Sequence, residues 1–177
     1  MRKSGKPRRH TRMHPAKNRK RFELDETDYL ILSMLQANAR ISNAEIARKA
    51  KMVPSGILER LRKLEENKII VGYETRLDSR ALGQELIAFV FVKTQEKTGR
   101  WDTAGQLAKI PEVQEVHAIS GEDCYLMKLR TGNPHELATL LRTKVQTIPS
   151  VQSTRTTIVL DTVRETSSIP LKKNGLH

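Results

Sequence analysis

Two short amphipathic helices joined by a tight turn are predicted between residues 41 and 64, and no other feature constrains the fold as strongly. Ser42, with Glu45 three residues later, is a pairing that begins a helix, because the hydroxyl and the carboxylate bond exposed backbone N–H groups. Pro54 suits the first position of the second helix, where its missing N–H would have no partner. The pattern is typical of a helix-turn-helix, whose second helix can enter the major groove of DNA. The residues expected to face inward on that helix are Ile57, Leu58, Leu61 and Leu64.

The outward side of the second helix carries small and charged side chains, as a DNA-binding surface requires. Arg60 and Lys63 are the strongest candidates, and phosphate contact is their expected role because base reading needs a more demanding geometry. The alternative is that Arg60 and Lys63 lie on a helix face that is simply exposed to solvent and binds nothing. The predicted DNA-binding residues are Pro54, Ser55, Gly56, Ile57, Glu59, Arg60 and Lys63.

The net charge of +12 is concentrated near the N-terminus. Ten of the 32 Lys and Arg residues lie in residues 1–21, which contain no Asp or Glu. The rest of the chain contains the other 22, together with all 20 Asp and Glu. We therefore predict that residues 1–22 form a disordered basic arm that binds phosphates without sequence preference. A solubilising tail is the alternative.

Several classes of protein are disfavoured by composition. Cys124 is the only cysteine, which excludes an internal disulfide and a multi-cysteine zinc site. No apolar run approaches the roughly 18 residues that a membrane-spanning helix needs. We expect no metal, no cofactor and no membrane partner, and a cytoplasmic location.

The second half of the chain changes from helical to strand periodicity. Residues 69–77 form a β-rich stretch suited to a wing or a hinge strand, and residues 78–83 a connector. The sequence Ile110-Pro111-Glu112-Val113-Gln114 recurs as Ile148-Pro149-Ser150-Val151-Gln152, which indicates two related βαβ halves. The predicted order βαββαβ is that of a ferredoxin-like sandwich, so the fold class is α+β. Strands are expected at 86–94, 113–120, 124–130 and 151–160, and helices at 101–110 and 134–147.

Four segments, in order, resemble the Lrp/AsnC (leucine-responsive/asparagine-type) family of transcriptional regulators. Leu24-Asp25-Glu26-Thr27-Asp28, with Ile31-Leu32, is similar to the family's opening helix, and residues 35–42 (LQANARIS) to the turn after it. Residues 61–65 (LRKLE) are similar to the end of its recognition helix, and residues 119–126 (ISGEDCYL) to its ligand-sensing segment. The resemblance covers about residues 24–163.

The resemblance implies an N-terminal winged helix-turn-helix at 23–68, a hinge strand and linker at 69–84, and a ferredoxin-like effector-binding and oligomerisation domain at 85–163. Residues 164–177 would be a C-terminal tail. Such proteins form homodimers through the sheet, which can assemble into tetramers or octamers, and bind double-stranded DNA and a small effector, usually an amino acid. The residues placed around the effector by the resemblance are Ser120, Gly121, Asp123, Tyr125, Thr154 and Thr156.

The chain departs from the family pattern around its second and third helices. Family members usually have Ser or Thr at the position of Val53, and a valine there cannot cap a helix, which should cost about 1 kcal/mol. Glycine is usual near Lys51 and near Lys68, and Asn67 is expected to take the left-handed conformation instead. Gly56 should cost up to ~1 kcal/mol of helix propensity.

Two other functions are compatible with parts of this pattern. A basic arm on an oligomer could compact DNA with little sequence preference, as an architectural protein does. Haem-precursor decarboxylases have a similar two-domain fold, but the sequence shows no nucleophile–base pair and no phosphate-binding glycine loop. A regulator that is not an enzyme is therefore the leading interpretation.

Overall fold

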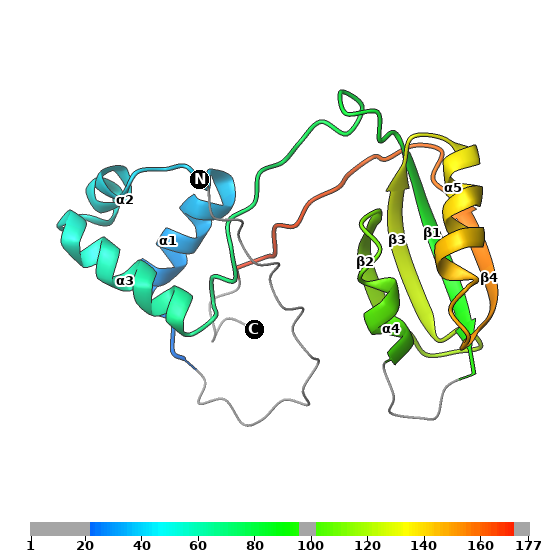
Figure 1. The fold of residues 1–177 in the computed structure, drawn as a ribbon. Helices are drawn as coiled ribbons and strands as arrows, with labels where there is room; N and C mark the ends of the chain where they lie inside the picture. The colour runs from blue at the N-terminus through cyan, green and yellow to red at the C-terminus, as the bar shows by residue number, and fades with distance from the viewer. Residues whose placement is uncertain (1–21, 96–101, 172–177) are drawn as a thin grey trace, which may run out of the picture. The chain divides into compact units, whose positions relative to one another are not determined.

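The computed structural model describes residues 22–95 and 102–171, which fall into two compact units (Figure 1). Of the described residues, one unit combines 22–74 with 168–171, and the other combines 75–95 with 102–167. Each unit has its own hydrophobic core. The predicted arm, apart from Phe22, and the predicted start of a helix at Trp101 lie outside the described residues.

The first unit contains three helices, α1 (Glu26–Ala37), α2 (Asn43–Ala50) and α3 (Pro54–Glu66). Asp25 and Asp28 cap the start of α1 reciprocally, each carboxylate accepting from the backbone N–H of the other at 2.9 and 3.2 Å. Ser42 caps α2, as predicted, by accepting from the N–H of Glu45 at 3.1 Å. The start of α3 at Val53 has no side-chain cap, also as predicted.

The core of this unit is apolar and draws on all three helices. The prediction that Leu58 faces inward is wrong, because its side chain is 59% exposed. The buried stripe of α3 runs through Ile57, Leu61 and Leu64, and the residue after Ile57 is rotated by about 100° away from it. The buried apolar residues are Ile31, Leu32, Met34, Ile46, Ala47, Ile57, Leu61 and Leu64.

The prediction of a strand at residues 69–77 is wrong, since no strand is assigned there. Ile69 and Ile70 instead close the end of α3, because both of their N–H groups donate to the carbonyl of Leu64. Val71, which follows, is 84% exposed and pairs with no strand in the part of the chain that the structure describes.

Left-handed backbone occurs at the two lysines where the family usually has a nearby glycine. Lys51, at the end of α2, has φ +54°, and Lys68, after α3, has φ +60°. Asn67 has φ −80°, so the expectation that it takes this conformation is wrong. A side chain at a left-handed position is strained, which is why glycine is favoured there.

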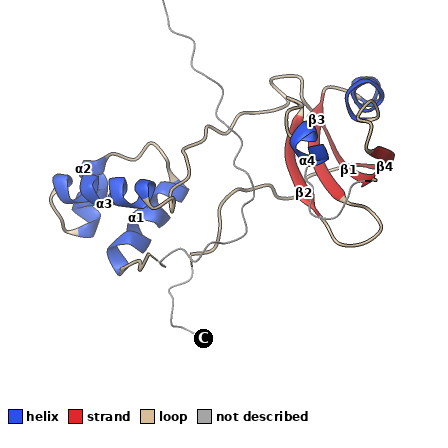
Figure 2. Cartoon of the chain, turned by 60° about the horizontal axis from the view of Figure 1, so that its bottom comes forward, coloured by secondary structure: helices blue, strands red, loops and turns tan. Residues whose placement is uncertain are grey.

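The second unit is a four-stranded antiparallel sheet with the strand order β2-β3-β1-β4 (Figures 1 and 2). This is the order of a ferredoxin-like sandwich, and it confirms the predicted fold. The elements are β1 (Leu86–Thr94), α4 (Asp102–Leu107), β2 (Val113–Ala118), β3 (Tyr125–Thr131), α5 (Pro134–Leu140), a π-helical turn η1 (Leu141–Val145) and β4 (Val151–Ile158).

One face of the sheet packs against the helices to form the second core. Alternation along β1 and β3 directs Val90 and Met127 to this face, where both are fully buried. Phe89, Phe91 and Leu126 belong to the opposite face, which carries no helix. The sheet residues of the core are Ala88, Val90, Val92, Tyr125, Met127 and Leu129.

The repeated Ile-Pro-x-Val segments have the same geometry in both halves. The N–H of Val113 donates to Ile110 at 3.0 Å, and the N–H of Val151 donates to Ile148 at 2.9 Å. Each turn leads into an edge strand of the sheet. The shared geometry supports the predicted relation between the two βαβ halves.

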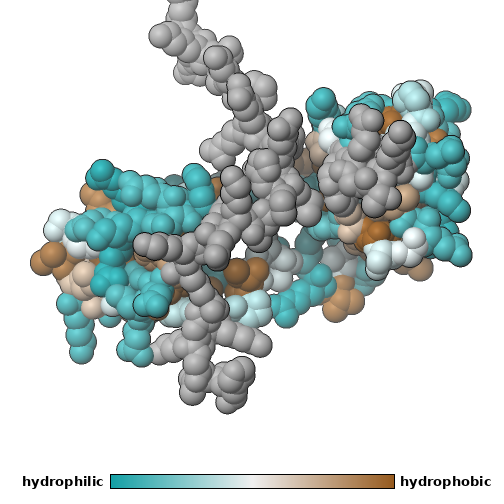
Figure 3. Space-filling model, turned by 90° about the horizontal axis from the view of Figure 1, so that it is seen from below, coloured by the Kyte–Doolittle hydropathy of each residue, from teal (hydrophilic) through white to brown (hydrophobic). Residues whose placement is uncertain are grey.

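The surface of both units is largely hydrophilic from the side drawn in Figure 3, with small hydrophobic patches. Among the described helices, none combines the length and the apolar character needed to cross a membrane.

Candidate nucleic-acid interface and effector site

The outward face of α3 carries two ion pairs, each between side chains one helical turn apart. Lys63 donates to Glu59 at 2.7 Å, and Arg62 donates to Glu66 at 3.2 Å, each pair spanning one turn of the helix. All four side chains are more than half exposed to solvent. Such pairs contribute little stability, so their partners can be exchanged for a ligand at small cost.

Of the seven predicted DNA-binding residues, four are exposed, Gly56 and Arg60 are partly buried, and one is buried. Pro54 and Ser55 are exposed at the start of α3, and Glu59 and Lys63 are exposed further along it. Ile57 is fully buried in the core, so it cannot contact DNA, and its place in the predicted set is corrected.

Gly56 is half-buried beside the turn between α2 and α3. A Cβ added there would lie 3.0 Å from the terminal methyl of Met52. Gly56 therefore leaves room for Met52 and offers no side chain of its own to a base.

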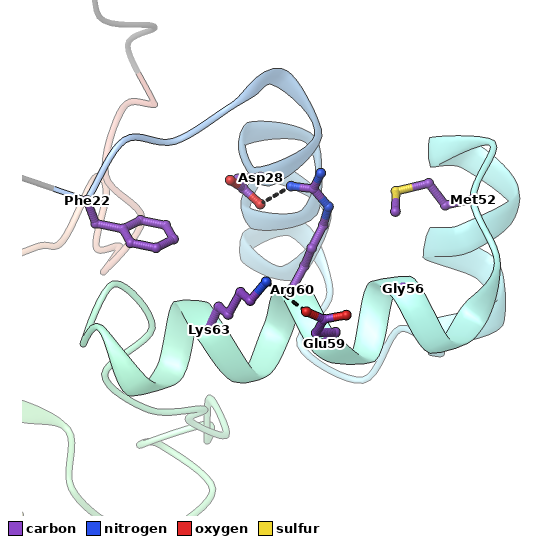
Figure 4. Close-up of a pocket in the computed structure, with 7 residues that line it drawn as sticks. All are labelled: Phe22, Asp28, Met52, Gly56, Glu59, Arg60 and Lys63. Carbon is purple, nitrogen blue, oxygen red and sulfur yellow. Dashed lines mark hydrogen bonds and ion pairs between the residues drawn. The ribbon is translucent and has the colours of Figure 1, made fainter.

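Arg60 does not point outward as expected. Its Nη1 donates to Asp25 at 2.7 Å and to Asp28 at 2.8 Å, so the guanidinium connects α3 to the start of α1 (Figure 4). The capping bond from the N–H of Asp28, helped by Arg60, lowers the pKa of Asp25. Asp25 and Asp28 in turn raise the pKa of Arg60. In this conformation Arg60 stabilises the packing of two helices.

A cavity of about 290 Å³ lies beside this ion pair, between α1, the α2–α3 turn and the flank of α3 (Figure 4). Lys63 and Glu59 meet at one edge of it, and Arg60 crosses it toward Asp28. The residues that line it are Phe22, Asp28, Met52, Gly56, Glu59, Arg60 and Lys63.

Sequence reasoning missed Arg62, which is 76% exposed on the outward face. The signal was present in the spacing: Arg62 lies three residues after Glu59 and therefore on the same side of the helix. It was overlooked because Leu58 was assigned to the inward stripe, which rotated the expected outward face toward Arg60.

The folded helical part carries almost no net charge. Residues 22–74 contain eight Lys and Arg and nine Asp and Glu, whereas residues 1–21 contain ten Lys and Arg and no acid. Residues 1–21 therefore carry most of the excess positive charge of the chain.

The predicted effector residues lie at two places in the second unit. Gly121 turns the chain between β2 and β3 with φ +125°, and Ser120 beside it is exposed. Asp123, in the same turn, accepts from Arg155 Nη2 at 3.0 Å, and the Arg155 guanidinium lies 3.9 Å from the centre of the Phe91 ring. A carboxylate and a guanidinium are thus brought side by side.

The other three effector candidates are separate from this turn or inaccessible. Tyr125 is 3% exposed and packs in the core, so its ring is not on the surface. Thr154 and Thr156 pair with Val92 and Val90, which places them on the helix-bearing face of β4, opposite to Arg155. The predicted set does not converge on one pocket within a single chain.

Comparison with known proteins agrees with this geometry. The family model described as the Lrp/AsnC ligand binding domain matches residues 87–169, and the one described as winged helix-turn-helix DNA-binding matches residues 24–71. An HTH-type transcriptional regulator of Pyrococcus horikoshii is 38% identical over 153 residues, which cover 86% of this chain and 99% of that protein. The chain belongs to the Lrp/AsnC family.

Solved structures of regulators resemble this Lrp/AsnC protein over most of their length. A transcriptional regulator from Neisseria meningitidis, in complex with L-Met, is 31% identical with a TM-score of 0.77, covering 83% of this chain and 96% of that one. The feast or famine regulatory protein of M. tuberculosis, complexed with L-methionine, is 29% identical with a TM-score of 0.75, covering 82% and 97%. The predicted family and fold are therefore confirmed.

A second charged cluster in this Lrp/AsnC protein lies on the open face of the sheet. Glu165, which follows β4, accepts from Lys128 and, at 2.6 Å, from Arg130. The bond from Lys128 is the main reason that the pKa of Glu165 is lowered. Both cations are about 15% exposed, so this cluster is far less accessible than the pairs on α3.

The described residues contain no cluster of three or more His, Cys, Asp or Glu that could hold a metal ion.

Proposed function

We propose that this Lrp/AsnC protein is a transcriptional regulator that binds specific sites in duplex DNA through the outward face of α3. The observation that carries the proposal is the exposed row of Ser55, Glu59, Arg62 and Lys63 on the second helix of the helix-turn-helix. In this motif the second helix lies in the major groove with its first turns nearest the bases. A regulator of this kind would act in the cytoplasm.

The basic segment at residues 1–21 supplies affinity in this proposal, and α3 supplies specificity. Ten positive charges would release counterions from the DNA backbone whatever its sequence. Removing residues 1–21 should therefore weaken binding to all duplexes alike and reduce its dependence on salt, with the preferred sequence unchanged.

Selection of bound duplexes from a random library, followed by sequencing, tests the proposal with the full chain. A two-fold symmetric dimer should enrich an imperfect inverted repeat, with half-sites about 10 base pairs apart or a multiple of that spacing. Strong, salt-sensitive binding with no enriched sequence would instead support an architectural DNA-binding protein.

The sheet unit is proposed to be the effector domain and to bind an amino acid at the Gly121–Asp123 turn. Support comes from the adjacent charges of Asp123 and Arg155, which are complementary to an ammonium and a carboxylate. Two similar structures contain L-methionine, so an amino acid with an apolar side chain is the first ligand to test.

Calorimetric titration of the full chain with each of the twenty amino acids tests this assignment. Binding of at least one amino acid, weakened by Asp123→Asn, is expected. No heat of binding with any of the twenty amino acids would contradict the effector role.

Homodimerisation is proposed to occur through the face of the sheet that carries no helix. Phe89, Phe91 and Leu126 belong to this face and are only partly buried in the single chain. Sedimentation analysis should show a dimer, or a tetramer or octamer built from dimers, and Phe89→Asp should shift it toward the monomer. A monomer at micromolar concentration would contradict this part of the proposal.

A further inference from the structure

We propose that the Glu59–Lys63 pair on α3 reads one G·C base pair in the major groove, with Lys63 donating to guanine and Glu59 accepting from cytosine. This inference rests on the proposed function and specifies which base pair the outward face of α3 prefers.

The first support is the position of the pair. Glu59 is the sixth and Lys63 the tenth residue of α3, and both point away from the core formed by Ile57, Leu61 and Leu64. Their side chains are 68% and 58% exposed. They therefore lie on the exposed side of α3, Glu59 in its second turn and Lys63 in its third.

The second support is the match between the pair and the edge of a G·C base pair. Lys63 Nζ and Glu59 Oε1 are 2.7 Å apart, which places a donor and an acceptor side by side (Figure 4). In the major groove, guanine presents the acceptors N7 and O6, and cytosine presents the donor N4–H₂ beside them. The guanine O6 and cytosine N4 are themselves hydrogen-bonded at about 2.9 Å, close to the separation of the two side-chain atoms.

An A·T pair is a poorer match. It presents its single donor, adenine N6–H₂, between two acceptors, adenine N7 and thymine O4, and it adds the thymine methyl. Adenine N6–H₂ and thymine O4 also lie side by side, but the two acceptors of A·T are separated by the donor, so Lys63 could contact only one of them, and beside O4 it would meet the thymine methyl.

The third support is the electrostatic cost of a carboxylate near DNA. An exposed Glu59 on a surface that faces phosphates is repelled unless it accepts a hydrogen bond from a base. The other carboxylate paired on this face, Glu66, is the last residue of α3 and lies seven residues beyond Glu59, further from the first turns that approach the bases. Glu66 is the matched control, because it also pairs with a cation one helical turn away.

The test uses the full chain and the duplex that it enriches from a random library. Each G·C pair of the half-site is replaced in turn by A·T, and the dissociation constants are measured for the wild type, Glu59→Ala, Lys63→Ala and Glu66→Ala. For the wild type, one replacement should weaken binding by roughly 5- to 100-fold. For Glu59→Ala and Lys63→Ala, discrimination at that same position should fall to about twofold or less.

The variants separate base reading from a surface ion pair. Glu59→Ala should tighten binding to a random duplex, because removing a negative charge reduces repulsion by the phosphates. Glu66→Ala should leave the profile of base preferences unchanged. Thermal unfolding of each variant checks that α3 is intact, which is expected since neither glutamate is buried.

Two results would overturn the inference while leaving the proposed function intact. One is a Glu59→Ala protein with the wild-type base profile. The other is a pair of variants, Glu59→Ala and Lys63→Ala, that lose discrimination at different positions. If the wild type enriches no sequence at all, the proposed function fails, and this inference fails with it.

Discussion

Ion pairs are held in two different ways in the two units of this Lrp/AsnC protein. On α3, Lys63 with Glu59 and Arg62 with Glu66 are more than half exposed and each spans one helical turn. On the sheet, Lys128 and Arg130 are about 15% exposed and share Glu165. The exposed pairs can exchange a protein partner for DNA, whereas the partly buried cluster is expected to remain intact.

Arg60 belongs with the second kind of pair although it lies on α3. Its guanidinium bonds Asp28, whose side chain is only 7% exposed. The boundary between the proposed binding surface and the residues that support the fold therefore runs along one helix, with Arg60 on one side and Glu59, Arg62 and Lys63 on the other.

The largest expected effect separates two neighbouring residues on this helix. Ile57→Ala should lower the free energy of unfolding by about 2–5 kcal/mol, because a fully buried side chain leaves a cavity. Leu58→Ala should lower it by less than about 0.5 kcal/mol, since that side chain is 59% exposed. Urea unfolding followed by circular dichroism measures both. Similar losses for the two variants would mean that the buried face of α3 is assigned incorrectly.

The next effect sharpens the distinction between Arg60 and Arg62. Arg60→Ala should lower the free energy of unfolding by about 1–3 kcal/mol, because Asp28 is left buried without its cation. Arg62→Ala should cost no more than about 0.5 kcal/mol, as is usual for an exposed pair one turn apart. The same unfolding experiment measures both variants. Equal losses of unfolding free energy would contradict the distinction between a structural Arg60 and a surface Arg62.

Much of the fold follows from the sequence, and the exceptions have physical causes. The β1 strand was predicted at its observed bounds, 86–94, because its alternation and branched residues are unambiguous. The stretch at 69–77 is also rich in branched and aromatic residues, but it pairs with no strand of the described residues, and composition alone cannot supply a partner. The predicted helix at 134–147 ends in the π-helical turn Leu141–Val145, where the hydroxyls of Thr143 and Thr147 donate to the carbonyls four residues earlier.

The candidate sites were harder to predict than the fold. Assigning one apolar residue, Leu58, to the wrong side of α3 shifted the expected surface toward Arg60 and away from Arg62. Arg155 was overlooked because its partner Asp123 lies 32 residues away in the sequence. Sequence spacing identifies the residues of one helix face, but pairs between separate elements depend on the sheet register.

The cluster around Glu165 provides a test by pH. Glu165→Gln should lower the free energy of unfolding by about 1 kcal/mol at neutral pH, a modest value because Glu165 is 39% exposed and partly screened. Lys128 and then Arg130 lower the pKa of Glu165 from its ordinary 4.5. Its contribution is therefore complete above that value and is lost as the pH falls through the lowered value in the folded protein.

Unfolding of the wild type and of Glu165→Gln at a series of pH values checks this expectation. The difference between them should be constant near neutrality and shrink as the solution is acidified below about pH 4.5. A difference that stays the same in acid would show that the cluster does not depend on the charge of Glu165.

The smallest expected effect compares the starts of α2 and α3. Val53→Ser should raise the free energy of unfolding by about 0.5–1 kcal/mol, because the hydroxyl can accept a backbone N–H that the valine leaves without a side-chain partner. Ser42→Ala should lower it by a similar amount, since Ser42 already caps α2. Calorimetric unfolding resolves both shifts, and a Val53→Ser protein no more stable than the wild type would show that this cap cannot form.

The central claim is that the exposed face of α3 is the DNA-binding surface, and two double variants with the same loss of charge test it most directly. One combines Arg62→Ala with Lys63→Ala, and the other combines Lys109→Ala with Arg142→Ala, both exposed in the second unit. Each is titrated against the duplex enriched by the wild type, at one salt concentration. Binding should weaken by about tenfold or more for the α3 variant and by less than about threefold for the other. Equal weakening by the two variants would contradict the claim.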